Sequence, residues 1–223
     1  LNLGFREAAS PILGALSAHS ILLDPEALGR LAAALRQADD RVAAVYGCAV
    51  FSETEARQPP ADAKPLRVTA EQFTQSCDRG LSNSCSLIRR DLWEAHPFPA
   101  ERCEDQRWAA HFLDRGYATL QLPSVRYRYR LDRPWSYYVR KHRDDLLMLH
   151  RTWPAAAWPK SALTDAAKVR YRFWHVCARL RCAGWRWERL SDKQKWWAAQ
   201  ELGLFLASAR TRGGRFWGGV AAA

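Results

Sequence analysis

Apolar and polar positions in the first part of the chain alternate between short runs and longer periodic segments. Two apolar runs, residues 12–17 and 41–51, are short, and the second is rich in valine and aromatic side chains. Such runs predict strands. Between them, Asp24-Pro25-Glu26 predicts the start of a helix that runs to about Gln37, because aspartate is a favoured N-cap and proline suits the first helical position.

The pattern continues with further short elements up to residue 130. In chain order we expect the end of a helix at 1–9, a surface loop at 52–65, a short helix at 70–77, a strand at 85–89, a helix at 104–115, and strands at 117–122 and 125–130. Gly116 fits the left-handed residue that commonly ends a helix. Helices that alternate with short strands indicate the α/β class, in which helices form layers on a sheet.

The character of the sequence changes after Pro134. The remaining segments predict helices only, rich in tryptophan and arginine, with a break at Pro154–Pro159. We therefore expect two domains, one over residues 1–152 and a basic, all-helical segment over 160–223. No internal repeat is visible.

Charge is distributed unevenly along the chain. The net charge is +11, and residues 165–223 contain twelve Lys and Arg against four Asp and Glu. Such a surplus suits an anionic partner: a phosphate-bearing substrate, a membrane surface or a nucleic acid. The six cysteines show no zinc-type spacing with histidine and predict reduced thiols in a cytosolic protein. The longest uncharged run, residues 8–23, is too short and too polar to predict a transmembrane helix, and no signal peptide is expected.

Two polar motifs carry the candidate chemistry. Glu104-Asp105 opens a predicted helix, and Ser82-Asn83 lies in a predicted turn upstream of it. Acidic residues at a helix start either satisfy free N–H groups or act as general bases. Serine and asparagine are ordinary turn residues. Trp108, three residues after the aspartate, is either a core tryptophan or an aromatic face available to a ligand.

The residues between the two motifs supply a wider context. They run SNSCSLIRRDLWEAHPFPAER from Ser82, and then come the Glu-Asp pair, Trp108 and Gly116-Tyr117. The order S-N, R-R, P-F, E-D-x-x-W, G-Y resembles the acceptor half of family 2 glycosyltransferases of the GT-A type. The resemblance covers roughly two thirds of the chain.

This resemblance implies a fold and a reaction. The fold is a partial GT-A, Rossmann-like mixed sheet flanked by helices, with residues 1–152 as the acceptor and catalytic portion. The reaction is transfer of a sugar, with inversion, from a nucleotide-sugar donor to a hydroxyl of a glycan or lipid-linked acceptor, as in bacterial cell-surface polysaccharide synthesis. The family's nucleotide-binding half would precede Leu1, so the chain is expected to be a fragment of such a domain.

The resemblance also implies residue roles. Asp105 is the expected catalytic base, and Glu104 orients it or an acceptor hydroxyl. Ser82, Asn83 and Arg89 are expected to bind substrate, and Trp108 would form the floor of the acceptor site.

The segment Leu16–Ser20 departs from the family pattern. Family 2 enzymes usually carry a D-x-D-type motif here that holds a metal and the nucleotide diphosphate, whereas this chain has Ser17 and His19. A neutral imidazole ligates Mn²⁺, but serine is a poor replacement for a carboxylate, and Mg²⁺ prefers oxygen ligands. His19 is thus the candidate ligand of a divalent metal, Mg or Mn, whose requirement is in doubt. Its alternative is a structural histidine.

Basic side chains offer another way to neutralise a diphosphate. Arg128 and Arg130 alternate with tyrosines on the strand predicted at 125–130 and share one face of it, and Arg140-Lys141 follow at the start of the helical region. The strand has Tyr129 where the family usually has a histidine. These four basic residues either bind phosphate or form a solvated surface.

The C-terminal helices interleave tryptophan with arginine. This composition suits an anionic membrane surface, single-stranded nucleic acid, or ordinary helix packing in which arginine stems cover apolar surface. Nucleic acid is the less favoured partner. We therefore expect the protein in the cytoplasm, bound peripherally to the inner face of the plasma membrane. The rival to a transferase is a non-catalytic basic module that binds a membrane or RNA.

Overall fold

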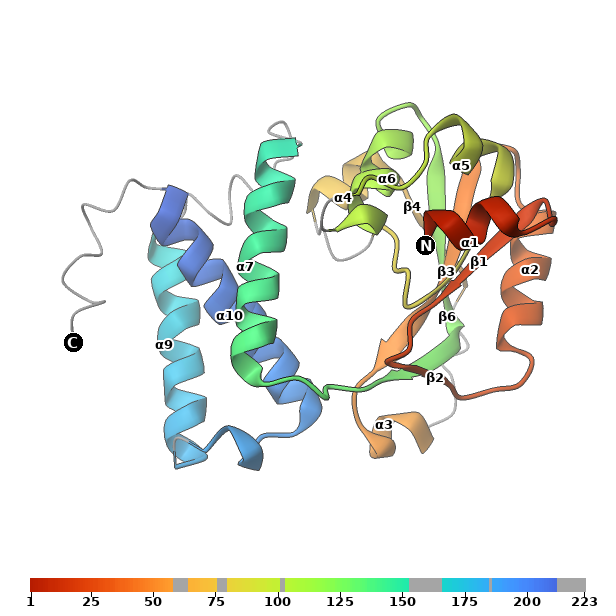
Figure 1. The fold of residues 1–223 in the computed structure, drawn as a ribbon. Helices are drawn as coiled ribbons and strands as arrows, with labels where there is room; N and C mark the ends of the chain where they lie inside the picture. Colours follow the sequence, from red (N-terminus) through yellow and green to blue (C-terminus); the bar gives the residue numbers. More distant parts are fainter. Residues whose placement is uncertain (58–63, 76–79, 101–102, 153–165, 185, 212–223) are drawn as a thin grey trace. The chain divides into compact units, whose positions relative to one another are not determined.

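The computed structural model describes residues 1–57, 64–75, 80–100, 103–152, 166–184 and 186–211 (Figure 1). The chain divides into two compact units, unit 1 (Leu1–Leu131) and unit 2 (Asp132–Ala223). The division precedes helix α7 (Trp135–Thr152), which the sequence analysis had assigned to the first domain. The expected break at Pro154–Pro159 lies outside the described residues.

Unit 1 is built on a six-stranded mixed sheet. Its order is β1-β5-β3-β6-β2, and β4 also pairs with β6. The strands are β1 (Ile12–Leu16), β2 (Ser20–Leu22), β3 (Val42–Val50), β4 (Leu66–Val68), β5 (Cys85–Arg89) and β6 (Ala118–Tyr129). Strands β3 and β6 run parallel, and the other pairs are antiparallel. The expected α/β class, a mixed sheet flanked by helices, is confirmed.

Strand β6 is continuous where the sequence predicted two strands. Its pairing with β3 slips after Leu122 and resumes at Arg126. Pro123 falls in this irregularity, where the missing N–H of proline removes no ladder bond. A Cβ on Gly47 of β3 would lie 2.8 Å from the Val125 carbonyl oxygen, so the two strands pass closely only because this residue is glycine. The long β6 can then pair with β4 along its first half and with β2 along its second.

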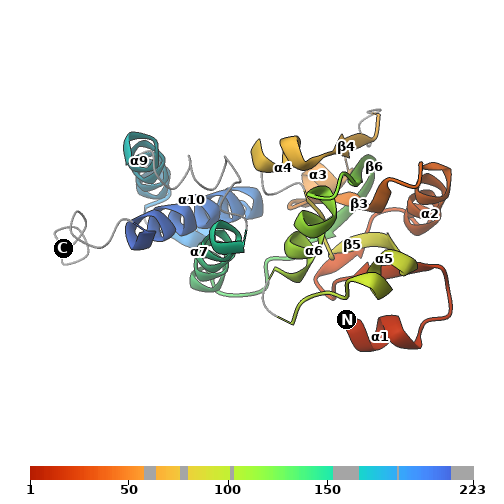
Figure 2. The ribbon, with the colours of Figure 1, turned by 90° about the horizontal axis from the view of Figure 1, so that it is seen from above.

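Helices cover the sheet on both sides (Figures 1 and 2). Helix α2 (Ala27–Gln37) buries Ala27, Leu31 and Leu35 against core residues of β3, β5 and β6. Helix α6 (Glu104–Leu113) lies on the other side and contributes Trp108 and Phe112 to an aromatic cluster. The packing of this aromatic cluster thereby fixes the position of the N-terminal end of α6.

The remaining helices of unit 1 are short: α1 (Asn2–Glu7), α3 (Glu53–Arg57), α4 (Ala70–Gln75) and α5 (Arg90–Ala95). Helix α3 forms within the expected loop because Ser52 Oγ accepts a hydrogen bond from Glu55 N at 3.0 Å, as an N-cap does. Helix α2 begins at Ala27 rather than Asp24. The Asp24 carboxylate instead accepts from Glu26 N at 2.8 Å and closes the turn before the helix.

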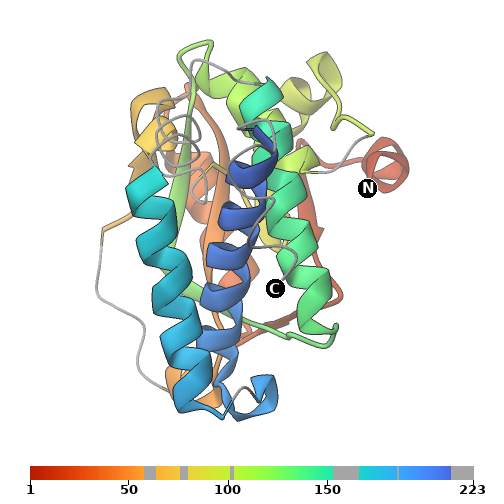
Figure 3. The same ribbon diagram turned by 90° about the vertical axis from the view of Figure 1, so that its left-hand side faces the viewer.

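Unit 2 is helical in its described part. It consists of α7, α9 (Ala166–Cys182), the 3-10 helix η2 (Trp187–Arg189) and α10 (Asp192–Thr211). Helix α10 lies between α7 and α9 (Figures 1 and 3). A Cβ on Gly203 of α10 would come within 2.8 Å of Arg143 N, so α7 and α10 touch backbone to backbone at this glycine. Among the described helices, none combines the length and apolar character that a bilayer span requires.

Candidate active site at the start of helix α6

Helix α6 begins with the two candidate carboxylates. Cys103, its N-cap residue, has φ 57° and ψ 39°, the left-handed conformation that non-glycine residues seldom adopt. This turn brings Glu104 and Asp105 into the first helical turn, where both side chains are partly exposed. The free N–H groups and dipole of a helix N-terminus favour negative charge there.

Asn83 connects both carboxylates to the upstream turn. Its backbone N–H donates to Asp105 Oδ2 at 3.2 Å, and its side-chain Nδ2 donates to Glu104 Oε1 at 3.3 Å. The other Asp105 oxygen accepts from Gln106 N at 2.8 Å. The carboxylate of Asp105 is therefore held at both oxygens by backbone donors, and the two motifs that the sequence singled out meet in space.

The turn itself is anchored to the sheet. Ser82 Oγ lies 3.2 Å from the hydroxyl of Tyr127 on β6, and Ser17 N donates to Ser84 O at 3.2 Å from the end of β1. Thr119 on β6 donates to Gly80 O at 2.7 Å just before the turn. Burial raises the pKa of Tyr127 to about 12, so its phenol stays neutral and retains its hydrogen-bonding proton.

Tyr127 was missing from the sequence prediction. It alternates with the arginines of VRYRYR and therefore points to the opposite face of β6. That alternation was visible in the sequence, but it could not show which face of the strand meets the turn.

Trp108 has a different role from the predicted one. Its side chain is completely buried, its Nε1 donates to His96 O at 2.8 Å, and its ring packs against Phe98 and Phe112. A ring enclosed on all sides presents no face to a sugar. The prediction that Trp108 forms the floor of the acceptor site is therefore wrong, and its alternative, a core tryptophan, is correct.

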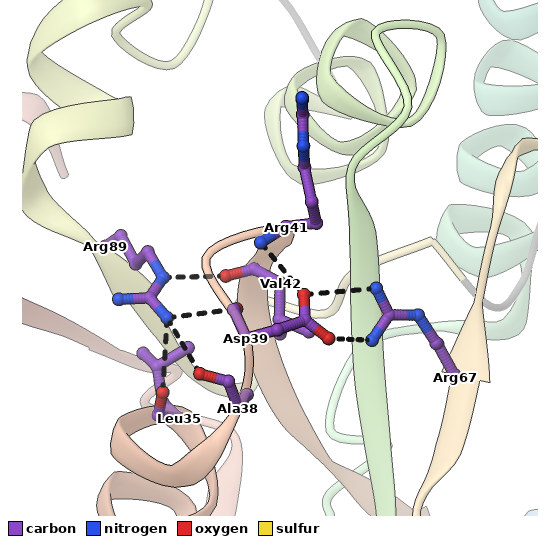
Figure 4. Close-up of polar contacts among 7 residues, drawn as sticks. All are labelled: Leu35, Ala38, Asp39, Arg41, Val42, Arg67 and Arg89. Carbon is purple, nitrogen blue, oxygen red and sulfur yellow. Dashed lines mark hydrogen bonds and ion pairs between the residues drawn. The ribbon is translucent and has the colours of Figure 1, made fainter.

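Arg89 is also placed differently from the prediction (Figure 4). It lies at the end of β5 away from the Ser82-Asn83 turn, and its Nε donates to Val42 O at 2.8 Å. Its Nη2 lies 3.2 Å from Asp39 O and within 3.5 Å of the Leu35 and Ala38 carbonyl oxygens. The guanidinium thus satisfies carbonyls at the C-terminus of α2. These contacts contradict a substrate-binding role.

A carboxylate lies next to the carbonyl oxygens that Arg89 contacts. Asp39 accepts from both terminal nitrogens of Arg67, at 2.7 and 3.3 Å (Figure 4), and this hydrogen bonding lowers the pKa of Asp39. The ion pair connects β4 to the loop before β3. The cluster in Figure 4 is therefore structural.

The basic residues predicted to bind phosphate fall into two groups. On β6, Arg128 forms an ion pair with Glu53 of α3 at 2.7 Å, and Arg130 is exposed, with its backbone N donating to His19 O at 2.9 Å. In unit 2, Arg140 is exposed on α7, and Lys141 pairs with Asp145 one turn along the same helix. Phosphate binding by these four residues stays a prediction.

His19 lies in the tight turn between β1 and β2. Its backbone N donates to Ser17 Oγ at 3.3 Å, and its ring lies near Tyr129, with 6.2 Å between centroids. The described residues contain no group of three or more His, Cys, Asp or Glu side chains that would hold a metal ion. One imidazole next to a serine and a tyrosine does not match the one or two carboxylates that usually hold Mg²⁺ together with substrate phosphates.

Comparisons with known proteins give the fold a context. No family model and no curated protein matches the chain. Among solved structures, it is similar to the mannosyltransferase PcManGT from Pyrobaculum calidifontis in complex with GDP-Man and Mn2+, with a TM-score of 0.56 and 14% sequence identity. The match covers 96% of this chain and 66% of that one. At this identity the likeness shows a shared fold with that protein and no more.

Proposed function

We propose that the protein is a glycosyltransferase that moves a sugar from a nucleotide-sugar donor to a hydroxyl of a glycan or lipid-linked acceptor, with inversion. The observation that carries the proposal is the Glu104-Asp105 pair, fixed by Asn83 at the start of α6. Its setting, a fold shared with a mannosyltransferase, supports the same reaction class.

Asp105 has the properties of a general base. In the proposed reaction the acceptor hydroxyl oxygen attacks the anomeric carbon as the bond from that carbon to the diphosphate oxygen breaks. The hydroxyl proton passes to an Asp105 oxygen, and the electron pair of the broken bond leaves with the diphosphate. Backbone donors to both Asp105 oxygens fix the carboxylate plane, so the base is oriented before the acceptor arrives.

Glu104 and the basic residues of each unit have separate proposed roles. Glu104 shares Asn83 with Asp105 and would orient an acceptor hydroxyl. Arg128, Arg130, Arg140 and Lys141 are the candidates for neutralising charge on the diphosphate. The described residues supply no metal-binding cluster, and no step of this proposal passes through a metal.

The experiment compares Asp105→Asn with Asp114→Asn in the full-length protein. Asp114 follows the same helix at its C-terminal end and is exposed, so it is a matched control. We expect Asp105→Asn to lower the transfer rate by a factor of about 10²–10⁴. Release of the nucleotide diphosphate is measured with a panel of donors that begins with GDP-mannose. Wild-type activity in Asp105→Asn would contradict the role of Asp105 as base.

The second candidate is a non-catalytic basic module. It is favoured by the charge of unit 2, which contains 18 Lys and Arg against 7 Asp and Glu. Calorimetry separates the two, because a transferase binds a nucleotide sugar and the module does not. We further propose peripheral binding to the cytoplasmic face of the plasma membrane and a place in cell-surface polysaccharide synthesis, which would bring the enzyme to lipid-linked acceptors.

A further inference from the structure

The net charge of the protein resides in one of its two units. Residues 1–131 contain 16 Lys and Arg and 16 Asp and Glu, whereas residues 132–223 contain 18 and 7. Unit 1 is therefore neutral overall, and unit 2 accounts for the whole +11. A charge confined to one unit indicates that this unit, and not the sheet unit, meets an anionic surface.

Helix α9 has one side that packs against α10. Val176 on this side is completely buried, and Phe173 stacks on Phe205 with 4.2 Å between ring centroids. Arg179 lies over the ring of Trp197 at 5.5 Å. These contacts fix the rotation of α9 about its own axis and so determine which residues face outward.

The outward side presents two aromatic rings. Tyr171 and Trp174 are 71% and 65% exposed, more than any other aromatic side chain in the described residues. Ala178 and Arg181 are also exposed and follow at helical spacing, so the four side chains form one stripe. Exposed Arg186 and Arg189 follow within a few residues of the helix end, with exposed Glu188 between them.

We infer that this outer stripe of α9, with the arginines that follow it, binds an anionic lipid bilayer. Tyrosine and tryptophan favour the membrane interface, because their rings enter the boundary of the acyl chains while their polar atoms stay with the headgroups. Each nearby Lys or Arg adds attraction to anionic lipids. The stripe lies on the outer side of a single helix, and such a shape suits a flat membrane surface. Single-stranded nucleic acid instead requires a basic groove.

The inference goes beyond the proposed transfer reaction and does not depend on it. It concerns unit 2 by itself, and its residues are separate from the Glu104-Asp105 pair. A non-catalytic protein with the same α9 would bind the same surface.

The test measures sedimentation of the full chain with vesicles of phosphatidylcholine, with and without phosphatidylglycerol. We expect binding only to the anionic vesicles and a decrease as salt is raised, because salt screens the attraction. The double variant Tyr171→Ser with Trp174→Ser should lower the partition coefficient about tenfold. Arg181→Glu should lower it at least about fivefold.

Matched controls come from unit 1. Leu3 is 69% exposed on α1, and Arg36 is exposed on α2, so Leu3→Ser and Arg36→Glu make comparable surface changes away from α9. Both should leave binding within about twofold of wild type. Circular dichroism checks that each variant is folded. If the double variant is unfolded, Arg181→Glu alone still tests the inference.

Three results would overturn the inference. The first is equal binding to neutral and anionic vesicles, since charge would then play no part. The second is wild-type binding by the folded α9 variants or an equal loss in the unit 1 controls. The third is tighter binding of a single-stranded RNA oligonucleotide than of anionic vesicles at the same salt, which would assign the face to nucleic acid.

Discussion

Units 1 and 2 each contain a partly buried basic side chain, and the hydrogen bonding of these two side chains is opposite. In unit 1, the Arg89 guanidinium donates to carbonyl oxygens at the end of α2 and at Val42. In unit 2, the His142 ring on α7 packs against Trp196 of α10, and its buried Nε2 atom has no hydrogen-bond partner among the described residues. Unit 1 therefore stabilises a half-buried cation through carbonyl oxygens, whereas the environment of His142 in unit 2 favours the neutral imidazole.

The difference agrees with the charge of the two units. Unit 1 has equal numbers of acidic and basic residues, so ion pairs such as Arg67–Asp39 and Arg128–Glu53 are available throughout it. Unit 2 has a large basic surplus, and an additional buried proton adds to repulsion that is already present. We therefore expect His142 to make unit 2 sensitive to acid. In unit 1, burial also lowers the pKa values of His96 and His111.

The largest expected effect follows from His142. Burial, with a smaller contribution from the Lys141 charge, lowers the pKa of His142 from 6.5 to about 3. As the pH falls, the unfolded chain protonates His142 before the folded protein does. The contribution of neutral His142 to stability is therefore fully present above pH 6.5 and is lost as the pH falls toward 3. The full loss is about 5 kcal/mol, and roughly 2–3 kcal/mol of it falls between pH 7 and pH 4.5. Urea unfolding followed by circular dichroism at pH 7 and pH 4.5 measures it.

The control for this prediction is His142→Leu, which replaces the imidazole by an apolar side chain. The variant should lose less stability than wild type between the two pH values, by roughly 2–3 kcal/mol. Equal losses in both proteins would show that other groups cause the acid sensitivity, and the contrast between Arg89 and His142 would then fail.

The next largest effect concerns Arg89. Removing its guanidinium with Arg89→Met should lower the free energy of unfolding by about 2–3 kcal/mol, because carbonyls at the C-terminus of α2 lose a charged donor. Arg36→Met is the control, since Arg36 is exposed in the last turn of the same helix, and it should cost less than about 0.5 kcal/mol. If Arg89→Met instead kept full stability and lost donor binding, the structural role argued from Figure 4 would be wrong.

The fold of unit 1 was predictable where local signals are strong. The apolar run of β5 gave its bounds correctly, and Gly116 adopts φ +79° after α6, as the glycine predicted. Strands β2 and β4, at three residues each, were not predicted. Such short strands exist because β6 offers them a partner, and nothing in their own sequence marks them.

The candidate site was predictable in part for the same reason. Glu104, Asp105 and Asn83 stand at element ends, where polar residues have a recognisable pattern, and the structure brings them together. Trp108 and Arg89 lie inside elements, and their surroundings depend on packing between segments far apart in the sequence. A motif gives the type of a residue but not whether its side chain faces a site or the core.

The smallest effect tests whether Asn83 positions the carboxylates or contacts the substrate. Asn83→Ala removes the Nδ2 donor to Glu104 but keeps the backbone donor to Asp105, so the base should be loosened and not lost. We expect kcat for sugar transfer to fall about tenfold, equivalent to about 1.4 kcal/mol, with both KM values within about twofold of wild type. Tyr127→Phe removes the contacts of the phenol to Ser82 and Ser84 but leaves Asn83 in place, and should have a smaller effect in the same direction. A raised KM with unchanged kcat would return Asn83 to the substrate-binding role that the family resemblance implies. Because neutral carbonyl oxygens hold the Arg89 guanidinium in unit 1, a change in kcat alone would show that neutral groups also hold the carboxylates of the candidate active site.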